Sequence, residues 1–312
     1  MKIKNIISMM LLILVFAACK DELNQDLKFG VKVIPSSSFT MTDSLITAVK
    51  GTSIEFEFAG EPDFISFSYE RFVLTNATLK FSTQAAWGTH FENTLNVYVS
   101  ETFTGLLLTE FTKDSEAVAK HAWKNVSDLS NLPKLANTTQ NASISLNEYR
   151  GKNVVIAFEY KPNFVTDWQP TWIVSNLLID NTMTTDNSSV STYLASTMGF
   201  SPFDVLDVAN AYKSVSDAGK WFVTNTAAME IKRTAPNNTL NQDWLISKPI
   251  PIPMGQTELS ETKGIKNISS RLNNYTYKFD KVGRYVVTFK AANQNYKNAS
   301  STEKQIKIEI TN

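Results

Sequence analysis

The sequence predicts an all-β protein of two sandwich domains. Apolar and polar residues alternate with a period of two along much of the chain, as they do in strands with one buried and one solvated face. Segments with helical periodicity are nearly absent. The 293 residues that follow Cys19 are too many for one small sandwich and enough for two domains that each bury a core.

The first eighteen residues have the pattern of a secretory signal peptide. Lys2 and Lys4 precede an apolar run over 6–18 that ends in two small alanines. A permanent membrane helix is the alternative, but the run is well short of the roughly 20 residues that a helix needs to cross a hydrocarbon core. We therefore expect residues 1–18 to be a signal peptide.

The segment FAAC, 16–19, resembles the lipobox at which bacteria acylate a cysteine and cut before it, with Phe16 where leucine is commoner. The resemblance implies that Cys19 carries a lipid anchor and begins a tether over 19–27, because several acyl chains bind a membrane stably. The triplet KDE at 20–22 resembles the export tag of Bacteroidota surface lipoproteins, and a plain solvated tether is the alternative. These features predict an outer-membrane protein that faces the cell exterior.

Four segments show the alternation most clearly, and each predicts a strand with one buried face. Their apolar residues are Ile54, Phe56 and Phe58; Tyr275, Tyr277 and Phe279; Tyr285, Val287 and Phe289; and Ile306, Ile308 and Ile310. A turn over 281–283 is expected between the second and third segments. Residues 202–217 are the only stretch with helical character, where a short helix and an irregular loop both remain open.

The strands at the two ends of the chain resemble those of a PKD-like immunoglobulin sandwich. The phrases FGVKVIP and GTSIEFEFAGEPDFISFSY, followed much later by YTYKFDKVGRYVVTFKAAN and EKQIKIEI, carry this resemblance. Such a sandwich needs about seven strands, and neither end supplies them alone. We therefore expect one discontinuous domain formed by 28–73 and 265–312. Two small independent β-units are the alternative, each with little core to offset its ordering entropy.

Residues 74–264 are then an inserted domain. The order of NATLKFSTQ, NTLNVYVSETF, GKNVVIAFEY and TWIVSNLLID resembles jelly-roll modules of the cleaved-adhesin and choice-of-anchor type. The segment NQDWLISKPI, 241–250, resembles the strand that normally opens such a module, although here it comes last. A circularly permuted jelly roll explains that order, brings the ends of the insert together, and would place this strand beside Leu79 and Phe81.

The lipobox, the charged triplet, the phrase GEPDFISFSY and the two kinds of sandwich together resemble a family of Bacteroidota surface lipoproteins filed as a domain of unknown function. The resemblance implies an architecture but no activity. Lipoproteins of this kind often neighbour starch-utilisation-type glycan importers. By association only, the resemblance therefore implies an extracellular glycan and an outer-membrane importer complex as partners.

The composition bears on partners and cofactors. Without Lys2 and Lys4 the chain has 28 basic and 30 acidic residues, a balance that does not attract nucleic acid. With Cys19 acylated, no thiol is left for a disulfide or a metal, and we expect no cofactor. In the segment DNTMTTDNSS, Asp180 and Asp186 offer oxygen ligands for calcium, but a solvated Asx-rich loop is the expectation.

No residue pattern predicts catalysis. His90 and His121 are the only histidines, and neither has a Ser/His/Asp or metal-ligand spacing around it. A glycosidase would need two carboxylates that face each other across a cleft, and no motif indicates such a pair. Phosphate-binding and zinc motifs are absent. We therefore expect a protein without enzymatic activity.

The tryptophans fall into two groups. Four lie in strand-like segments and are expected to pack in a core, namely Trp123, Trp172, Trp221 and Trp244. Trp87 and Trp168 are flanked by Gly, Pro, Asn and Asp, which marks loops. A large ring in a loop either closes the end of a sandwich or contacts a ligand such as a sugar, and both interpretations remain open.

The sequence thus favours a non-catalytic, lipid-anchored cell-surface protein that binds a glycan in connection with polysaccharide uptake. The alternative is a structural or accessory subunit of an outer-membrane complex, or an adhesin that binds protein. In addition, Asp43-Ser44-Leu45 resembles the O-glycosylation site of exported Bacteroidota proteins, which implies Ser44 as an acceptor.

Overall fold

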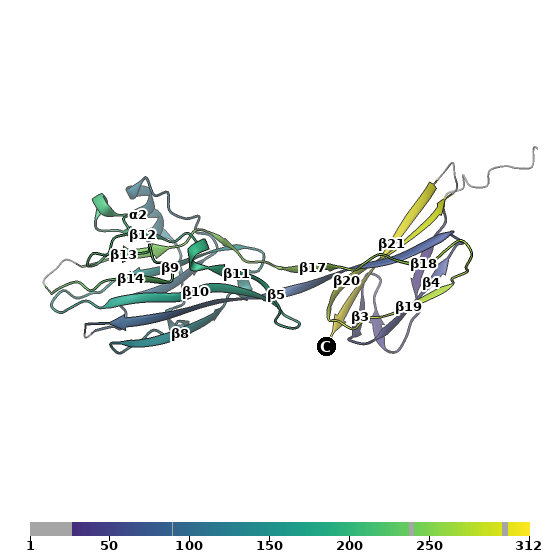
Figure 1. The fold of residues 1–312 in the computed structure, drawn as a ribbon, viewed down its shortest axis with the longest axis horizontal. Helices are drawn as coiled ribbons and strands as arrows, with labels where there is room; N and C mark the ends of the chain where they lie inside the picture. The colour runs from purple at the N-terminus through teal and green to yellow at the C-terminus, as the bar shows by residue number, and fades with distance from the viewer. Residues whose placement is uncertain (1–26, 89, 237–239, 295–298) are drawn as a thin grey trace, which may run out of the picture. The chain divides into compact units, whose positions relative to one another are not determined.

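The computed structural model describes residues 27–88, 90–236, 240–294 and 299–312. Strands dominate it, and they form several sheets without a barrel, which confirms the predicted all-β sandwich class (Figure 1). The chain divides into two compact units. The smaller unit combines the described residues up to Phe72 with Thr257–Asn312, and the larger unit is Val73–Gln256.

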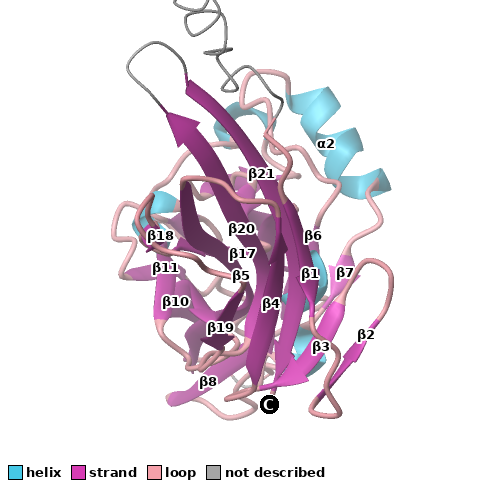
Figure 2. Cartoon of the chain, turned by 90° about the vertical axis from the view of Figure 1, so that its right-hand side faces the viewer, coloured by secondary structure: helices cyan, strands magenta, loops and turns pink. Residues whose placement is uncertain are grey.

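The smaller unit has two sheets. One is the antiparallel sheet β1-β4-β19, and the other has the order β5-β20-β21-β3-β2, with β17 and β18 also paired to β5. The long strands β20 and β21 lie side by side (Figure 2). The elements are β1 (Gly30–Val33), β2 (Phe39–Met41), β3 (Ile46–Val49), β4 (Ser53–Ala59), the first part of β5 (Phe64–Ala86), β17 (Gly255–Leu259), β18 (Lys263–Lys266), β19 (Asn274–Lys278), β20 (Gly283–Gln294) and β21 (Ala299–Thr311).

Aromatic side chains from both sheets form the core of the smaller unit. Phe56 and Phe58 point inward from β4, and their ring centroids lie 4.9 and 5.2 Å from that of Phe289 on β20. Phe67 on β5 adds a contact at 5.4 Å to the same ring. The alternation in the sequence predicted these inward faces, and the buried positions on β4 confirm it.

Strands from opposite ends of the chain pair with each other in this unit. Strand β4 pairs with β19, and β3 pairs in parallel with β21, where Ile46 lies opposite Ile308. The inserted segment ends earlier than the expected residue 264. Because β18 pairs with the first part of β5, with Lys263 opposite Phe67, it belongs to the smaller unit and not to the insert.

Arg71 is the most deeply buried cation of the smaller unit's described residues. Its side chain is 3 % exposed, and its Nη2 lies 2.6 Å from Oε2 of Glu258, which is 34 % exposed. Its Nη1 also donates a hydrogen bond of 2.7 Å to the carbonyl of Val282. The guanidinium therefore joins β5, β17 and the turn before β20.

Replacing Glu258 by Ala should lower the unfolding free energy by about 2–3 kcal/mol, because it leaves the buried guanidinium without a counter-charge. Urea denaturation of the whole protein measures this loss. The matched control is Glu309→Ala, which breaks the more exposed pair with Arg284 and should change stability by less than about 1 kcal/mol. Equal losses in the two variants would contradict the argument.

The larger unit is also a two-layer sandwich. One sheet contains β8, β5, β10, β14 and β13 in that order, with β11 also on β10, and the other has the order β12-β15-β9-β6-β7, with β16 on β9. The elements are the second part of β5, β6 (Leu95–Ser100), α2 (Phe111–Lys120), β7 (Lys124–Asn125), β8 (Thr138–Ser145), β9 (Asn153–Tyr160), β10 (Thr171–Met183), β11 (Ser189–Leu194), β12 (Ser201–Asp204), β13 (Trp221–Phe222), β14 (Ala228–Ile231), β15 (Asp243–Ile246), β16 (Ile250–Pro251) and 3-10 turns at Ser127–Leu129, Asn147–Tyr149, Ala195–Thr197 and Val208–Asn210.

The core between these sheets includes two of the tryptophans expected inside. Trp172 is fully buried on β10, and its Nε1 donates to Thr94 Oγ1 at 3.0 Å. Trp221 is buried beside it in the same cluster, and its Nε1 donates to the carbonyl of Asp243 at 3.2 Å. Each indole thus buries its ring while its one polar atom finds a partner.

A second apolar cluster covers the outer face of the β12-β15-β9-β6-β7 sheet. The Trp123 and Trp244 rings stack there with centroids 5.5 Å apart. Helix α2 packs on this cluster through Val118, whose carbonyl accepts a hydrogen bond from Trp123 Nε1 at 3.1 Å. In the described part of the chain, no helix combines the length and the apolar character that crossing a membrane requires.

The structure answers one open question about the larger unit and overturns one expectation. Residues 202–217 contain the end of β12 and a 3-10 turn but no α-helix, because the Asp204 carboxylate accepts the backbone N–H groups of Leu206 and Asp207 and forms a turn. The late strand β15 does not lie beside Leu79 and Phe81. It pairs with β9 and β12 in the opposite sheet, so the proposed permutation does not hold in that form.

Candidate functional site

Several loops of the larger unit meet at one end of its sandwich. Strand β5 ends at Ala86 opposite Thr171, where β10 begins, and β14 ends at Ile231 opposite Trp172. Strand β6 begins at Leu95, in the other sheet, opposite the last residue of β9. The described residues of three loops, 87–88 with 90–94, 161–170 and 232–236, therefore emerge together, and we call them the end loops.

The end loops bring Trp87 and Trp168 to the same cation. The guanidinium carbon of Arg233 lies over the Trp168 ring at 4.3 Å from its centroid and over the Trp87 ring at 5.1 Å. Trp87 is 60 % exposed and Trp168 is 40 % exposed. The two sequence-predicted tryptophans thus come from different loops to one exposed cluster, and neither ring is part of the hydrophobic cores.

The backbone at Trp87 has an unusual conformation. Trp87 has φ +59° and Gly88 has φ +83°, both in the left-handed region that bulky side chains rarely adopt. A Cβ on Gly88 would come within 3.0 Å of the carbonyl oxygen of Trp168, so the glycine allows the two loops to approach closely. This arrangement presents the Trp87 ring to solvent at a cost of about 1–3 kcal/mol in backbone strain.

Hydrogen bonds beneath the cluster fix its position. The backbone N–H of Arg233 donates to Thr171 Oγ1 at 2.9 Å, and that of Gln169 donates to the carbonyl of Thr234 at 3.1 Å. Gln169 is fully buried, and its Nε2 donates to the carbonyl of Phe164 at 2.9 Å. These hydrogen bonds therefore fix the backbone that carries the exposed rings and the cation.

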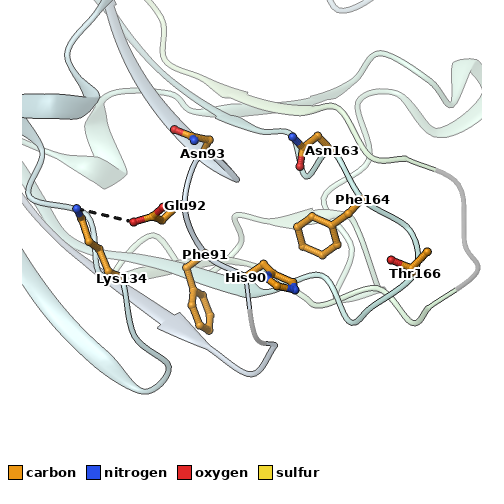
Figure 3. Close-up of a pocket in the computed structure, with 8 residues that line it drawn as sticks. All are labelled: His90, Phe91, Glu92, Asn93, Lys134, Asn163, Phe164 and Thr166. Atoms are coloured by element: carbon orange, nitrogen blue, oxygen red, sulfur yellow. Dashed lines mark ion pairs between the residues drawn. The ribbon is translucent and has the colours of Figure 1, made fainter.

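A pocket of about 540 Å³ opens on two of the end loops, at 90–93 and 163–166, and is completed by Lys134 (Figure 3). His90 Nε2 lies 3.4 Å from Asp167 Oδ2, and the His90 ring meets the Phe164 ring edge to face at 5.2 Å. Across the pocket, Lys134 Nζ lies 3.9 Å from Glu92 Oε1. The lining residues are His90, Phe91, Glu92, Asn93, Lys134, Asn163, Phe164 and Thr166. Amide, imidazole, ammonium and carboxylate groups thus lie around the partly exposed Phe164 ring, whereas the Phe91 ring is buried in the core against Trp172.

The other residues singled out from the sequence lie elsewhere. Cys19 and the signal segment fall outside the described residues. Ser44 is exposed in the turn between β2 and β3 of the smaller unit. Asp180, on β10, forms an ion pair with Lys80, whose Nζ lies 3.0 Å from Asp180 Oδ2. Asp186 Oδ1 accepts a hydrogen bond from the hydroxyl of Ser188. Within the described ranges, no group of three or more His, Cys, Asp or Glu side chains could hold a metal ion.

A buried acid cluster at the start of β15 was not predicted by any pattern in the sequence. Asp243 is 2 % exposed and lies opposite Asp204, which binds the ammonium of Lys220. Burial, with the adjacent charge of Asp204, raises the pKa of Asp243 to about 8. Asp207 also binds Lys220, at 3.0 Å, and hydrogen bonds from Asn210 and Lys220 lower its pKa to about 2.

Ser100 and His121 form a pair that the sequence spacing did not reveal. The Ser100 hydroxyl lies 2.6 Å from His121 Nε2, and burial lowers the pKa of His121. The same hydroxyl oxygen accepts backbone N–H groups from Thr102 and Phe103 and holds the turn after β6. The described residues place no carboxylate on the other nitrogen of His121, so the pair lacks the third member of a triad.

Comparisons with known proteins give one result. A family described as "Domain of unknown function (DUF5017)" matches residues 18–200, which is more than half of the chain. No curated protein and no solved structure matches the chain.

Proposed function

Since the chain belongs to the DUF5017 family, whose description names no activity, we propose from the site itself that this is a non-catalytic binding protein whose end loops bind a glycan. The observation that carries the proposal is the convergence of Trp87 and Trp168, both exposed, on Arg233 in end loops that also carry a polar pocket. Sugars are recognised by flat aromatic faces together with a few hydrogen-bonding groups, and the end loops provide both.

The exposure of the two rings favours ligand contact over closure of the sandwich end. A ring that closes a core should be largely buried, as Trp172 is, whereas Trp87 is 60 % exposed. The contact with Arg233 is worth about 0.5–1 kcal/mol at an exposed site. That gain does not offset the strain at Trp87, and strained backbone that persists in a fold is characteristic of functional sites.

The proposal includes a location. In it, Cys19 carries a lipid that anchors a Bacteroidota protein to the outer surface of the outer membrane. The smaller unit is a PKD-like base, and the larger, jelly-roll-like unit presents the ligand site, in association with a glycan importer. The charged triplet after Cys19 supports this arrangement. Labelling cells with radioactive palmitate tests the anchor, since a Cys19→Ala protein should lose a label that the native protein carries.

Ser44 is proposed as an O-glycosylation site. Its exposure in a short turn, closed by the hydrogen bond from Thr42 N–H to the carbonyl of Leu45 at 2.9 Å, leaves the hydroxyl accessible to a transferase. Mass spectrometry of the protein from its native host would show the added mass on this residue, and an unmodified peptide would exclude it.

Trp87→Ala and Trp168→Ala should each weaken glycan binding at least tenfold, because each removes one aromatic face of the site. A glycan array followed by calorimetry measures the effect. Trp123→Ala is the control, since that ring lies on the outer cluster and its loss should lower the melting temperature without a direct effect on binding.

Thermal melting separates the proposal from its alternative. Lost binding with an unchanged melting temperature supports a sugar platform. A drop of several degrees, with no glycan bound by the native protein, would instead favour a structural subunit or a protein-binding adhesin in which the rings stabilise the loops.

A further inference from the structure

We infer that the end loops recognise an acidic sugar, with the Arg233 guanidinium as the group that binds its carboxylate. This inference rests on the proposed glycan-binding function and specifies the class of sugar. It starts from the charge that lies between the two exposed indoles.

The nearby acidic groups already have partners. Asp167 lies against His90 and accepts the backbone N–H of Trp168, and Glu92 lies against Lys134. Among the described residues, no carboxylate forms an ion pair with Arg233, whose side chain is exposed. The positive charge at the centre of the cluster is therefore uncompensated within the described part of the protein.

The contacts of Arg233 suit a carboxylate in particular. A guanidinium that stacks on aromatic rings uses its faces, while its N–H donors lie in its plane and remain available. Two parallel N–H groups match the two oxygens of a planar carboxylate, and such bidentate pairs are short and strong. The backbone hydrogen bond from Arg233 to Thr171 fixes the base of the side chain at the end of β14.

A uronic acid presents the matching groups within one sugar residue. Its carboxylate is attached directly to the pyranose ring, so an apolar ring face and an anionic group lie within a few ångströms of each other. Trp87 or Trp168 would stack on the ring while Arg233 binds the carboxylate. The whole chain is nearly neutral, with 30 basic and 30 acidic residues, so general attraction to polyanions does not explain such binding.

The test compares polysaccharides that differ only in charge. Polygalacturonate, alginate and hyaluronate are each measured against their carboxyl-reduced, neutral forms by affinity electrophoresis and calorimetry. We expect at least one uronate polymer to bind and its reduced form to bind about 10–100-fold more weakly, the range for a hydrogen-bonded charge pair. Binding should also weaken when salt rises from 50 to 300 mM.

Three variants assign the effect to Arg233. Arg233→Met keeps most of the length of the side chain but removes the charge, and its affinity for the uronate polymer should be about 10–100-fold lower than that of the native protein. Arg233→Lys keeps the charge but lacks the planar, bidentate guanidinium. Its affinity should lie between those of the native protein and Arg233→Met. Lys80→Met is the control. It removes one positive charge from β5, outside the end loops, where the ammonium lies 3.0 Å from Asp180, and should leave affinity unchanged.

The outcomes separate this inference from the function on which it rests. Equal binding of acidic and reduced polymers, lost in Trp87→Ala, would keep the glycan site and overturn the acidic specificity. Equally tight binding of dextran sulfate would show that charge alone is recognised, which also overturns it. If neither neutral nor acidic polymers bind the native protein, the proposed function itself is wrong.

Discussion

The larger unit is expected to lose about 4 kcal/mol of unfolding free energy as the pH rises from 5 to 9, because of Asp243. Its pKa is about 8 in the folded protein, against 3.8 for an unperturbed aspartate. Between these values the folded state holds a proton that the unfolded state has released, so stability falls as the pH rises. From pH 5 to about pH 8 the two states differ by one bound proton. Over these roughly three pH units the unfolding free energy falls by about 1.4 kcal/mol per unit.

Asp243→Asn should remove this slope. The amide is neutral at every pH in the window and fits the same space opposite Asp204, so the variant should exceed the native protein in stability at pH 9. Urea denaturation at pH 5, 7 and 9 measures both proteins. Asp217→Asn, at an exposed aspartate of a nearby loop, is the control. A native protein whose stability is unchanged or rises from pH 5 to 9 would show that Asp243 is not held protonated.

The choice of window excludes an opposing effect. The pKa of Asp207 is lowered to about 2 by hydrogen bonds from Asn210 and Lys220. A lowered pKa contributes stability that is present above about pH 4 and is lost as the pH falls toward 2. Measurements below pH 4 would therefore combine two titrations of opposite sign. The lowered pKa of His121 adds a rise in stability up to about its unperturbed value of 6.5, so the fall between about pH 7 and 9 is the part that reports Asp243 alone.

Trp172→Ala should lower the unfolding free energy of the larger unit by about 3–5 kcal/mol and its melting temperature by roughly 10 °C. The indole is fully buried, meets the Phe91 ring edge to face at 6.5 Å, and donates to Thr94. Its removal leaves a cavity beside Phe91 and removes the donor to the Thr94 hydroxyl oxygen. Differential scanning calorimetry measures the change.

Trp168→Ala provides the matched control for this loss. The same residue type is replaced only four positions earlier, but its ring is 40 % exposed, so we expect a change of less than about 1 kcal/mol. The pair also separates two effects on ligand binding. Trp168→Ala should weaken binding in a folded protein, whereas Trp172→Ala should do so by loosening the loop that carries Trp87. Similar melting temperatures for both variants would contradict the assignment of core and site.

The period-two alternation was a good guide to which side chains face inward. Ile54, Phe56 and Phe58 are buried on β4, and Tyr285 and Phe289 are buried on β20. The signal is reliable because each strand has one solvated face, so polar residues mark it directly.

Helices were harder to predict. Helix α2 has ten residues, and only Phe111 and Val118 contact the apolar cluster, which is too short an apolar pattern to distinguish from a loop in the sequence. Polar contacts add to this packing, because the Asp114 carboxylate accepts the N–H groups of Leu107 and Leu108 and the hydroxyl of Tyr212. Such long-range hydrogen bonds leave no periodic pattern in a sequence.

The candidate site was predictable only in part. Turn-forming neighbours marked Trp87 and Trp168 as loop residues, which local sequence can do. Arg233 could not be found in this way. Its place beside the rings depends on the pairing of β5 with β10 and of β10 with β14, which brings together segments that are distant along the chain.

The parallel pairing of β3 with β21 also determines when each unit can be completed during synthesis. All the strands that build the sandwich of the larger unit have been synthesised once Pro251 is added, whereas the partner of Ile46, Ile308, is added much later. The amino-terminal strands are thus translated first but find their strand partners last, because the entire insert is translated before those partners. Pairing over such a separation is slow in general, so the larger unit is the part of the chain that can be folded while the smaller unit is still incomplete.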